Sequence, residues 1–196
     1  MTDKERKTLV LASGNKGKIA EIGEMLPEFS VIGYKDAGLD FEIEETGATF
    51  YENALIKAKA VSEALGLPAF ADDSGLCVNA LSGAPGIFSA RFAGDGNDEH
   101  NIDKLLKELD GVKDRSAKFV CSLVLYYPDG KIISAEGETN GEILFERAGK
   151  NGFGYDPIFY SADLKKSLGE ASSKEKNSVS HRSRALKNLK EKLKKI

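Results

Sequence analysis

Apolar and polar positions in the first third of the chain follow the pattern of a strand–helix–strand unit. The runs Thr8–Ala12 and Phe29–Tyr34 are short and almost continuously apolar, which is typical of buried strands. A helix from about Ile19 to Leu26, ended by Pro27, is predicted between them. Because such crossovers are right-handed, we expect the two strands to be parallel.

The clearest helical period covers Thr49–Leu65. Phe50, Ala54, Ala58, Val61 and Leu65 fall on one face. Lys57 lies in the middle of that face, with Asn53 beside it. A lysine in this place either extends to the surface or meets an anion, and the pattern leaves both open.

The second half alternates between strands and helices. Its elements predict antiparallel pairing and therefore, with the parallel unit before it, a mixed sheet. We expect a helix at Asp98–Leu109, strands at Ala117–Tyr127 and Lys131–Thr139 around the turn Pro128-Asp129-Gly130, an edge strand at Gly141–Phe145, a short helix or turn at Ala162–Leu168, and a last helix capped by Ser180 with Leu186, Leu189, Leu193 and Ile196 on its apolar face.

Size and composition narrow the class of protein. The 196 residues suit one large domain or two small lobes around one cleft, and no linker separates independent parts, so we expect a single domain, 1–196. A net charge of -3 disfavours nonspecific nucleic-acid binding. Cys77 and Cys121 lie in apolar runs and are expected to be reduced core residues. No apolar run approaches the length of a membrane span and no signal peptide is visible, so we expect a cytoplasmic protein.

Two adjacent carboxylates, Asp72 and Asp73, interrupt the apolar runs Leu67–Ala71 and Leu76–Leu81. Strands disfavour Asp, so the pattern predicts a strand that stops, an acidic corner and a strand that resumes. The two carboxylates repel each other, and a cation would stabilise them. An ordinary turn is the alternative, because Asp-Ser-Gly is common in turns.

Two loops are candidates for ligand binding. Ser13–Lys18 connects a strand to a helix and carries a glycine-rich, basic sequence that suits a phosphate, although it lacks the ending of a Walker A motif. Gly149–Gly154 leads into Phe153-Gly154-Tyr155-Asp156, whose aromatic rings could stack on a nucleobase. The alternatives are an ordinary strand-to-helix turn and a mobile loop whose aromatic rings cover the core.

Cationic side chains in four separate segments could bind the phosphates of a nucleotide. They are Lys16 and Lys18, Lys57, Lys176 in a polar loop, and His181-Arg182 at the start of the last helix. Carboxylates that could hold Mg²⁺ are Asp73 and Asp72, with Glu45 only if the fold brings it near. Together these groups favour metal-assisted phosphoryl or nucleotidyl chemistry.

The chain resembles the inosine triphosphate pyrophosphatase family over nearly its whole length. The matching segments, in order, are Ser13–Lys18, Glu45-Thr46-Gly47, Phe50–Ala54, Ala71–Leu76, Gly83–Arg91, Phe153–Phe159 and Ser180-His181-Arg182. A small departure is Phe88, where most members have tyrosine. The resemblance implies an α/β fold with an elongated mixed central sheet flanked by helices, in two lobes with the active-site cleft between them.

The resemblance also implies an activity and a set of roles. The family hydrolyses nonstandard purine nucleoside triphosphates (ITP, dITP, XTP) to the monophosphate and pyrophosphate, which cleanses the nucleotide pool. It further implies Mg²⁺, a homodimer, and no nucleic-acid or membrane partner. Asp73 would be the general base and a metal ligand, with Glu45 also at the metal. The expected substrate-binding residues are Ser13, Gly14, Asn15, Lys16, Gly17, Lys18, Lys57 and Lys176 for phosphate, and Ser74, Phe153, Gly154, Tyr155, Asp156, His181 and Arg182 for the nucleoside.

Three other functions stay open at the level of sequence. One is a nucleic-acid-binding module that uses the basic last helix. The net negative charge of the chain and the inward stripe Leu186/Leu189/Leu193 argue against this function. Another is a nucleotide sensor that binds without turnover, and the paired aspartates argue against it. The third is a related pyrophosphatase that acts on pyrimidine nucleotides. The sequence does not rank ITP, dITP and XTP, and it does not give the number of metal ions or say whether Asp72 shares the role of Asp73.

Overall fold

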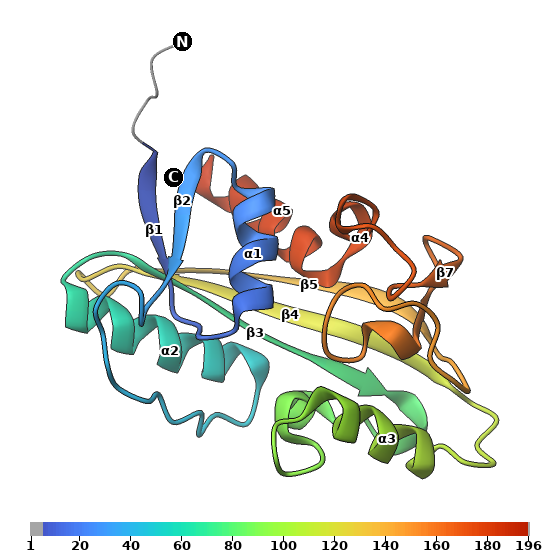
Figure 1. Cartoon of the computed structure of the whole chain (residues 1–196). Coiled ribbons are helices and arrows are strands. Elements are labelled where there is room, and N and C mark those ends of the chain that lie inside the picture. The colour runs from blue at the N-terminus through green and yellow to red at the C-terminus, as the bar shows by residue number, and fades with distance from the viewer. Residues whose placement is uncertain (1–5, 196) are drawn as a thin grey trace. The chain divides into compact units, whose positions relative to one another are not determined.

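A computed structural model describes residues 6–195 of the chain (Figure 1). The chain divides into two compact units: unit 1 comprises Met1–Asp73, Ser122–Ala135 and Leu189–Ile196, and unit 2 comprises Ser74–Cys121 and Glu136–Asn188. Seven strands form a mixed sheet in the order β2-β1-β3-β4-β5-β6-β7. The predicted mixed α/β fold is therefore confirmed.

Unit 1 begins with the expected strand–helix–strand unit. β1 (Lys7–Leu11) and β2 (Phe29–Gly33) are parallel, and Figure 1 shows them side by side with α1 (Lys16–Met25) beside them. α1 begins earlier than predicted because the side chain of Asn15 caps it by accepting from the backbone N–H of Lys18. Lys16 and Lys18 therefore lie on the first turn of a helix and not in a loop.

The second helix of unit 1, α2 (Phe50–Leu65), has the predicted bounds and apolar face. Thr49 caps its first turn, and Gly66 ends it in the left-handed conformation that glycine adopts at low cost. Ala54, Ala58 and Val61 are fully buried and pack in the core of unit 1. The other buried members of that core are Val10, Ala12, Tyr34, Ala69, Ala71 and Val124.

β3 (Ala69–Val78) runs straight through the paired aspartates, so the predicted acidic corner is wrong. Aspartate is unfavourable in a buried strand when its charge has no partner. Here each carboxylate forms an ion pair with a lysine. Leu67, which was expected to begin the strand, is exposed, and a short 3-10 helix, η1 (Asn79–Leu81), follows β3. The alternation of side chains along a strand sends Asp72 and Asp73 to opposite faces of the sheet.

The hairpin of β4 (Ser116–Tyr126) and β5 (Ile132–Ile143) is longer than predicted. Gly141, which suggested the start of a separate edge strand, lies within β5 and pairs with Ser161 of β6 (Phe159–Ser161). A side chain at this glycine would meet the Tyr160 carbonyl oxygen at 2.1 Å, so the glycine permits a close approach and does not end the strand. The segment predicted as a short helix or turn at 162–168 contains a turn and β7 (Lys166–Ser167), which pairs with β6.

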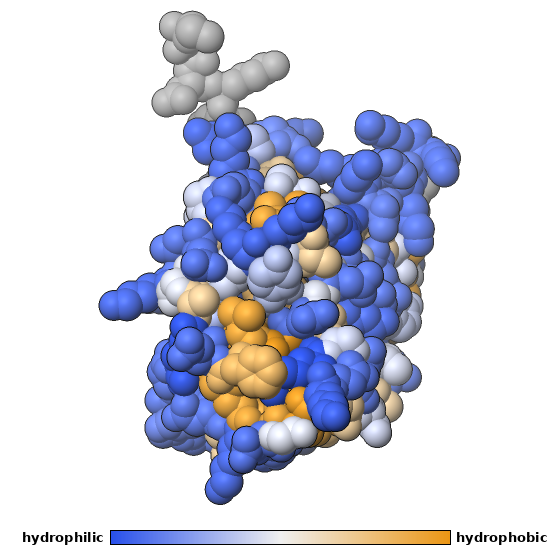
Figure 2. Space-filling view, turned by 90° about the vertical axis from the view of Figure 1, so that its right-hand side faces the viewer, coloured by the Kyte–Doolittle hydropathy of each residue, from blue (hydrophilic) through white to orange (hydrophobic). Residues whose placement is uncertain are grey.

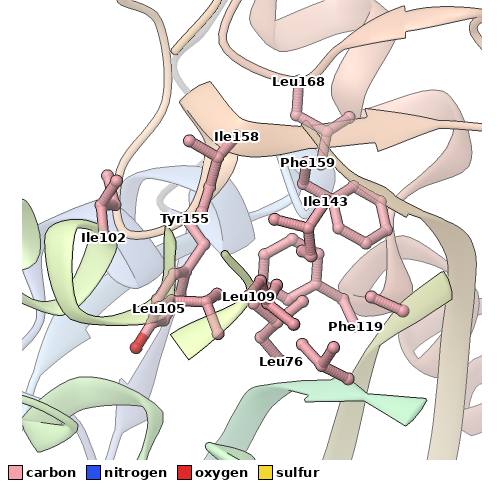
Figure 3. Close-up of a cluster of buried hydrophobic side chains, with 12 residues drawn as sticks. Leu76, Ile102, Leu105, Leu109, Phe119, Ile143, Tyr155, Ile158, Phe159 and Leu168 are labelled. Carbon is pink, nitrogen blue, oxygen red and sulfur yellow. The ribbon is translucent and has the colours of Figure 1, made fainter. Parts of the chain in front are cut away.

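Unit 2 has its own apolar core, drawn in Figure 3. α3 (Asp98–Glu108) contributes Ile102 and Leu105, which point toward Tyr155 and Ile158 in that view. Within the described residues, Cys77 on β3 and Cys121 on β4 form no disulfide, as expected; Cys121 is buried in the core, whereas Cys77 is only half-buried. The remaining elements of this unit are η2 (Gly86–Arg91), η3 (Asp156–Ile158) and α4 (Ser173–Val179), and α5 (His181–Leu193) begins in it.

α4 was not predicted, and it removes Lys176 from the expected polar loop. A capping box begins this helix: Ser172 accepts from the Glu175 backbone, while the Glu175 side chain accepts from the Ser172 backbone. On α5, Leu186 and Leu189 are buried as predicted and Leu193 is largely exposed, while Ile196 lies outside the described residues. Among residues 6–195, no helix is long and apolar enough to cross a membrane.

On the face that Figure 2 shows, most side chains are hydrophilic, and hydrophobic side chains gather in one patch. In unit 2 the most exposed large apolar side chains are Phe145, at 79%, and Phe88, at 54%. The guanidinium groups of Arg115 and Arg91 lie over these two rings, respectively. Cation–π contacts of this kind reduce the cost of exposing an aromatic ring.

Candidate active site

In unit 1, two predicted site residues with carboxylate side chains lie against a third, Lys57. Lys57 Nζ donates to Asp73 Oδ1 at 2.7 Å and to Glu45 Oε1 at 3.1 Å. The lysine does not extend to solvent, since it is only 7% exposed. Of the two alternatives for Lys57, the structure supports contact with anions, and they are carboxylates of the protein.

A second lysine meets the other aspartate. Lys18 Nζ lies 2.6 Å from Asp72 Oδ1 and 3.4 Å from the Asp72 backbone oxygen, and Asp72 is fully buried. Asp72 thus holds Lys18, a partnership that the sequence did not reveal. We call Lys18, Glu45, Lys57, Asp72 and Asp73 the carboxylate–lysine cluster.

The second carboxylate oxygen of Asp73, Oδ2, is the atom of this cluster that could accept a ligand. Asp73 is 6% exposed, and its Oδ2 has no hydrogen-bond partner among the described residues. Burial raises the pKa of the Asp73 carboxyl above its ordinary value, although Lys57 and Lys18 act in the opposite direction. Burial also opposes the charge on Lys57, but Asp73 and Glu45 outweigh it and raise the pKa of that lysine.

The cluster fits a hard divalent cation. Asp73 and Glu45 share Lys57, Asp72 pairs with Lys18, and the buried Asp73 Oδ2 has no partner among the described residues. Within residues 6–195 no group of three or more His, Cys, Asp or Glu side chains is arranged as a metal cage. Mg²⁺ does not need a cage, because it binds one or two carboxylates together with water and substrate oxygens.

The segment Ser13–Lys18 supplies the start of α1. Ser13 Oγ accepts from the Asn15 backbone at 3.1 Å, and Asn15 Oδ1 accepts from the Lys18 backbone at 3.1 Å. Gly14 has open space where a side chain would be, while Gly17 is half-buried on the helix and Lys16 is exposed. Of the two basic residues, the structure thus brings Lys18 to the cluster and leaves Lys16 at the surface.

Asn53 belongs to the same face of α2 as Lys57, one turn earlier. It is fully buried, and its Oδ1 accepts from the Gly47 backbone N–H at 2.8 Å. Its Nδ2 has no partner among the described residues. The amide cannot be turned around to avoid this, because its nitrogen would then face the Gly47 donor. An unpaired buried group of this kind costs about 1–3 kcal/mol.

Unit 2 gathers the residues that were assigned to the nucleoside. Lys176 Nζ lies 2.5 Å from Asp156 Oδ2, and both side chains are buried. The same Asp156 oxygen accepts from the Phe153 backbone at 2.9 Å. Lys176 Nζ also lies 4.5 Å from the centroid of the Phe153 ring. The predicted contact of Lys176 with phosphate is untested, and in this structure the residue supports the aromatic loop.

The start of α5 adds its cation to the same ring. Arg182 is 1% exposed, its guanidinium carbon lies 5.9 Å from the Phe153 centroid, and Nη2 lies 3.5 Å from Ser74 Oγ. We call Phe153, Asp156, Lys176 and Arg182 the aromatic–cation cluster. Beside it, His181 is buried and stacks on Phe119 with a centroid distance of 4.8 Å.

The loop that carries Phe153 is fixed from two sides. The Gly154 backbone donates to Asp98 Oδ2 at 2.8 Å, at the start of α3. Tyr155 is buried and its hydroxyl donates to the Ser89 carbonyl at 2.9 Å. Burial raises the pKa of that phenol, so it remains a donor. Asp98 was missed at the level of sequence, because an acidic residue in a first helical turn already has a local explanation.

The fold and the two clusters define a class: an α/β protein with buried carboxylates and lysines in unit 1 and a cation-lined aromatic loop in unit 2. The backbone passes directly from one unit to the other at Asp73-Ser74. The family model described as Ham1 family matches residues 9–192. The chain therefore belongs to the Ham1 family, and the resemblance found in its sequence is confirmed.

Named relatives match nearly the whole chain. A dITP/XTP pyrophosphatase of Haemophilus influenzae is 51% identical over 195 residues, which cover 96% of this chain and all of the relative. A dITP/XTP pyrophosphatase of Staphylococcus epidermidis is 48% identical over 184 residues, covering 93% of this chain and 94% of the relative. The solved structure of the Staphylococcus aureus Ham1 protein superposes with a TM-score of 0.86 at 46% identity and covers 96% of this chain and 98% of that one.

Proposed function

We propose that this protein is a nucleoside triphosphate pyrophosphatase that hydrolyses dITP, XTP and ITP to the nucleoside monophosphate and pyrophosphate. Relatives named dITP/XTP pyrophosphatase match it over more than nine-tenths of its length. The observation that carries the proposal is the buried Asp73 carboxylate, which shares Lys57 with Glu45 and whose Oδ2 has no hydrogen-bond partner among the described residues. Removal of deaminated purine nucleotides from the pool would be its physiological effect.

In this mechanism Asp73 is the general base. Its raised pKa brings it closer to the value at which a carboxylate accepts a proton efficiently, and its unpaired Oδ2 is available to a water molecule. Asp73 would take a proton from that water molecule while the water oxygen attacks the α-phosphorus. The bond from the α-phosphorus to the bridging oxygen then breaks, and pyrophosphate leaves.

Asp73 and Glu45 are the residues that would hold Mg²⁺. When bound, the ion would neutralise charge on the phosphate oxygens and orient the attacking water. The side-chain cations of Lys18 and Lys57 would stabilise the negative charge that develops on the leaving pyrophosphate. Residues 13–17 would add backbone N–H groups and the N-terminal end of α1, where an anion is favoured.

The aromatic–cation cluster would hold the nucleoside. The Phe153 ring offers a stacking surface, and Ser74, Gly154, Tyr155 and Asp156 shape its surroundings. We assign His181 and Arg182 as donors to the 6-oxo group of hypoxanthine or xanthine. Adenine carries an amino group there and would leave those buried donors unpaired, which is a strong basis for rejection.

The remaining parts of the proposal are a single catalytic domain, 1–196, a homodimer and a cytoplasmic location. No nucleic-acid or membrane partner is proposed. Sedimentation velocity tests the dimer, which a monomer at micromolar concentration would contradict.

The decisive experiment compares dITP, XTP, GTP and dTTP as substrates with Mg²⁺, measured as pyrophosphate release. We expect kcat/KM for dITP and XTP to exceed that for dTTP by at least about a hundredfold, and a site with buried hydrogen-bond donors can discriminate more strongly than this. GTP shares the 6-oxo group with dITP and XTP, so any discrimination against GTP would have to come from its 2-amino group. A preference for dTTP would instead favour a pyrimidine pyrophosphatase. Binding without pyrophosphate release would favour a nucleotide sensor, and salt-sensitive binding of oligonucleotides without hydrolysis a nucleic-acid-binding module.

A further inference from the structure

The turn that carries Glu45 is attached to the first turns of α2 at two backbone positions. Gly47 N–H donates to Asn53 Oδ1 at 2.8 Å, and Ala48 N–H donates to Glu52 Oε2 at 2.6 Å. A side chain at Gly47 would meet Glu52 Cβ at 2.6 Å and Asn53 Oδ1 at 2.7 Å, so the turn lies directly against the helix. The position of Glu45, two residues before Gly47, depends on this attachment.

The same face of α2 contacts the turn a second time. Lys57, one helical turn after Asn53, donates to Glu45 Oε1 at 3.1 Å and to Asp73 Oδ1 at 2.7 Å. Asn53 and Lys57 thus fix the backbone and the carboxylate of one short segment from one helix face. The orientation of the Asn53 side chain therefore affects the position of the Glu45 carboxylate relative to Asp73.

A buried asparagine in unit 2 provides a direct comparison. Asn101 lies four residues after the N-cap of α3, as Asn53 lies four residues after the N-cap of α2. Asn101 Oδ1 accepts from the Ala93 backbone at 2.6 Å, and its Nδ2 donates to the Ala90 carbonyl at 3.3 Å. Asn101 therefore satisfies both ends of its amide, whereas the described residues offer Asn53 Nδ2 no acceptor. A buried group left unpaired in this way calls for an explanation beyond loop packing.

We propose that Asn53 is a positioning residue, which holds the Gly47 backbone so that the Glu45 carboxylate stands beside Asp73 and completes the divalent-cation site. Asn53 acts through Glu45 and touches neither metal nor substrate in this role. The inference rests on the proposed function, because Glu45 and Asp73 are taken there as metal ligands. Outer residues that orient a ligand of a metal typically change its affinity tenfold to a hundredfold when they are removed.

The test is a double-mutant cycle on metal binding, read without turnover. Mn²⁺ serves as the probe, and its dissociation constant is measured by electron paramagnetic resonance in the full-length protein without nucleotide. We expect Asn53→Ala to raise this constant about tenfold. Glu45→Gln should raise it at least as much, and Asn53→Ala added to Glu45→Gln should change it little further. Non-additivity of this kind shows that one residue acts through the other.

One further variant controls for the loss of a buried asparagine, and another can replace Asn53→Ala in the test. Asn101→Ala removes a buried asparagine from the matching helical position in unit 2 and should lower the melting temperature while leaving Mn²⁺ affinity unchanged. Gly47→Ala pushes the turn away from α2 from the other side and should reproduce Asn53→Ala, so it carries the test where Asn53→Ala does not fold. An unchanged Mn²⁺ affinity in the folded variant, or additive effects in the cycle, would overturn the inference.

Failure of the inference is distinguishable from failure of the proposed function. If the wild-type protein releases pyrophosphate from dITP while removal of Asn53 leaves metal affinity unaltered, the inference alone is wrong. If the wild-type protein does not hydrolyse dITP, the proposed function is wrong, and the Mn²⁺ cycle still decides whether Asn53 orients Glu45.

Discussion

The two clusters hold their charges in opposite ways. In the carboxylate–lysine cluster, Asp72 pairs with Lys18 while Asp73 and Glu45 share Lys57, and within residues 6–195 nothing hydrogen-bonds to the buried Asp73 Oδ2. In the aromatic–cation cluster, Lys176 and Arg182 lie against the Phe153 ring, and Asp156 is the buried carboxylate partner of Lys176. The first arrangement suits an added cation, and the second suits an electron-rich ring with oxygen acceptors. Under the proposed function, the chemistry would therefore fall to unit 1 and the recognition of the base to unit 2, and this division is open to experiment.

The strongest test of this comparison is to remove the charge of the Asp73 carboxylate, whose Oδ1 is paired with Lys57 and whose Oδ2 has no partner among the described residues. Asp73→Asn keeps the size of the side chain but loses the base and the negative charge, so kcat should fall by about 10³-fold or more, within the range that general bases contribute. Binding of a non-hydrolysable dITP analogue, measured by calorimetry, should survive because the aromatic–cation cluster is intact. Asp110→Asn, an exposed position after α3, is the control. Substantial turnover by Asp73→Asn would remove Asp73 from the role of base.

The next challenge concerns recognition. Arg182→Ala should lower kcat/KM for dITP about a hundredfold while the low activity with ATP changes much less, because the lost donor contributes only to the 6-oxo substrates. Arg184, two residues further on α5, pairs with Asp163 at 2.8 Å, and Arg184→Ala should leave the dITP:ATP ratio unchanged. Arg182 is almost fully buried, so Arg182→Lys, which keeps a cation, provides a second variant. An unaltered dITP:ATP ratio in both Arg182 variants would place base selection elsewhere.

A smaller effect is expected where the aromatic loop is attached. Asp98→Ala removes the acceptor of the Gly154 N–H and frees the loop that carries Phe153. The KM for dITP should rise a few-fold with kcat nearly unchanged, since a hydrogen bond of this kind contributes about 1 kcal/mol. Asp103→Ala, on the same helix, breaks an ion pair with Arg147 and is the control. A fall in kcat without a change in KM would contradict the separation of the two clusters.

The sequence was most informative where one period settles the structure. The 3.6-residue repeat of 49–65 predicted α2 and the inward position of Lys57, and the order of strands predicted a mixed sheet. The partner of Lys57 could not be predicted in the same way. Glu45 and Asp73 come from other segments, and only the fold brings them to the lysine.

The errors have specific physical causes. The pair Asp72-Asp73 suggested a corner because local propensity counts each aspartate as exposed, whereas Lys18 and Lys57 satisfy both within β3. α4 was missed because a seven-residue helix without an apolar stripe gives no period. Its capping box, Ser172 with Glu175 three residues later, was nevertheless a readable signal, and it would have placed Lys176 on a helix.

The smallest predicted effect tests how α4 holds Lys176 in the aromatic–cation cluster. A hydrogen bond from Lys166, with further contributions from Ser172, lowers the pKa of Glu175 from 4.5 to about 2. A carboxyl group with a lowered pKa in the folded state stabilises the fold above its unfolded pKa and loses that contribution as the pH falls toward 2. Glu175→Gln should therefore lower the melting temperature slightly at pH 7, and its difference from wild type should shrink between pH 4.5 and pH 2. Glu146→Gln, an exposed change in a loop, should show no such pH-dependent difference. A constant difference across this range would mean that the capping box stabilises α4 through packing and not through its charge.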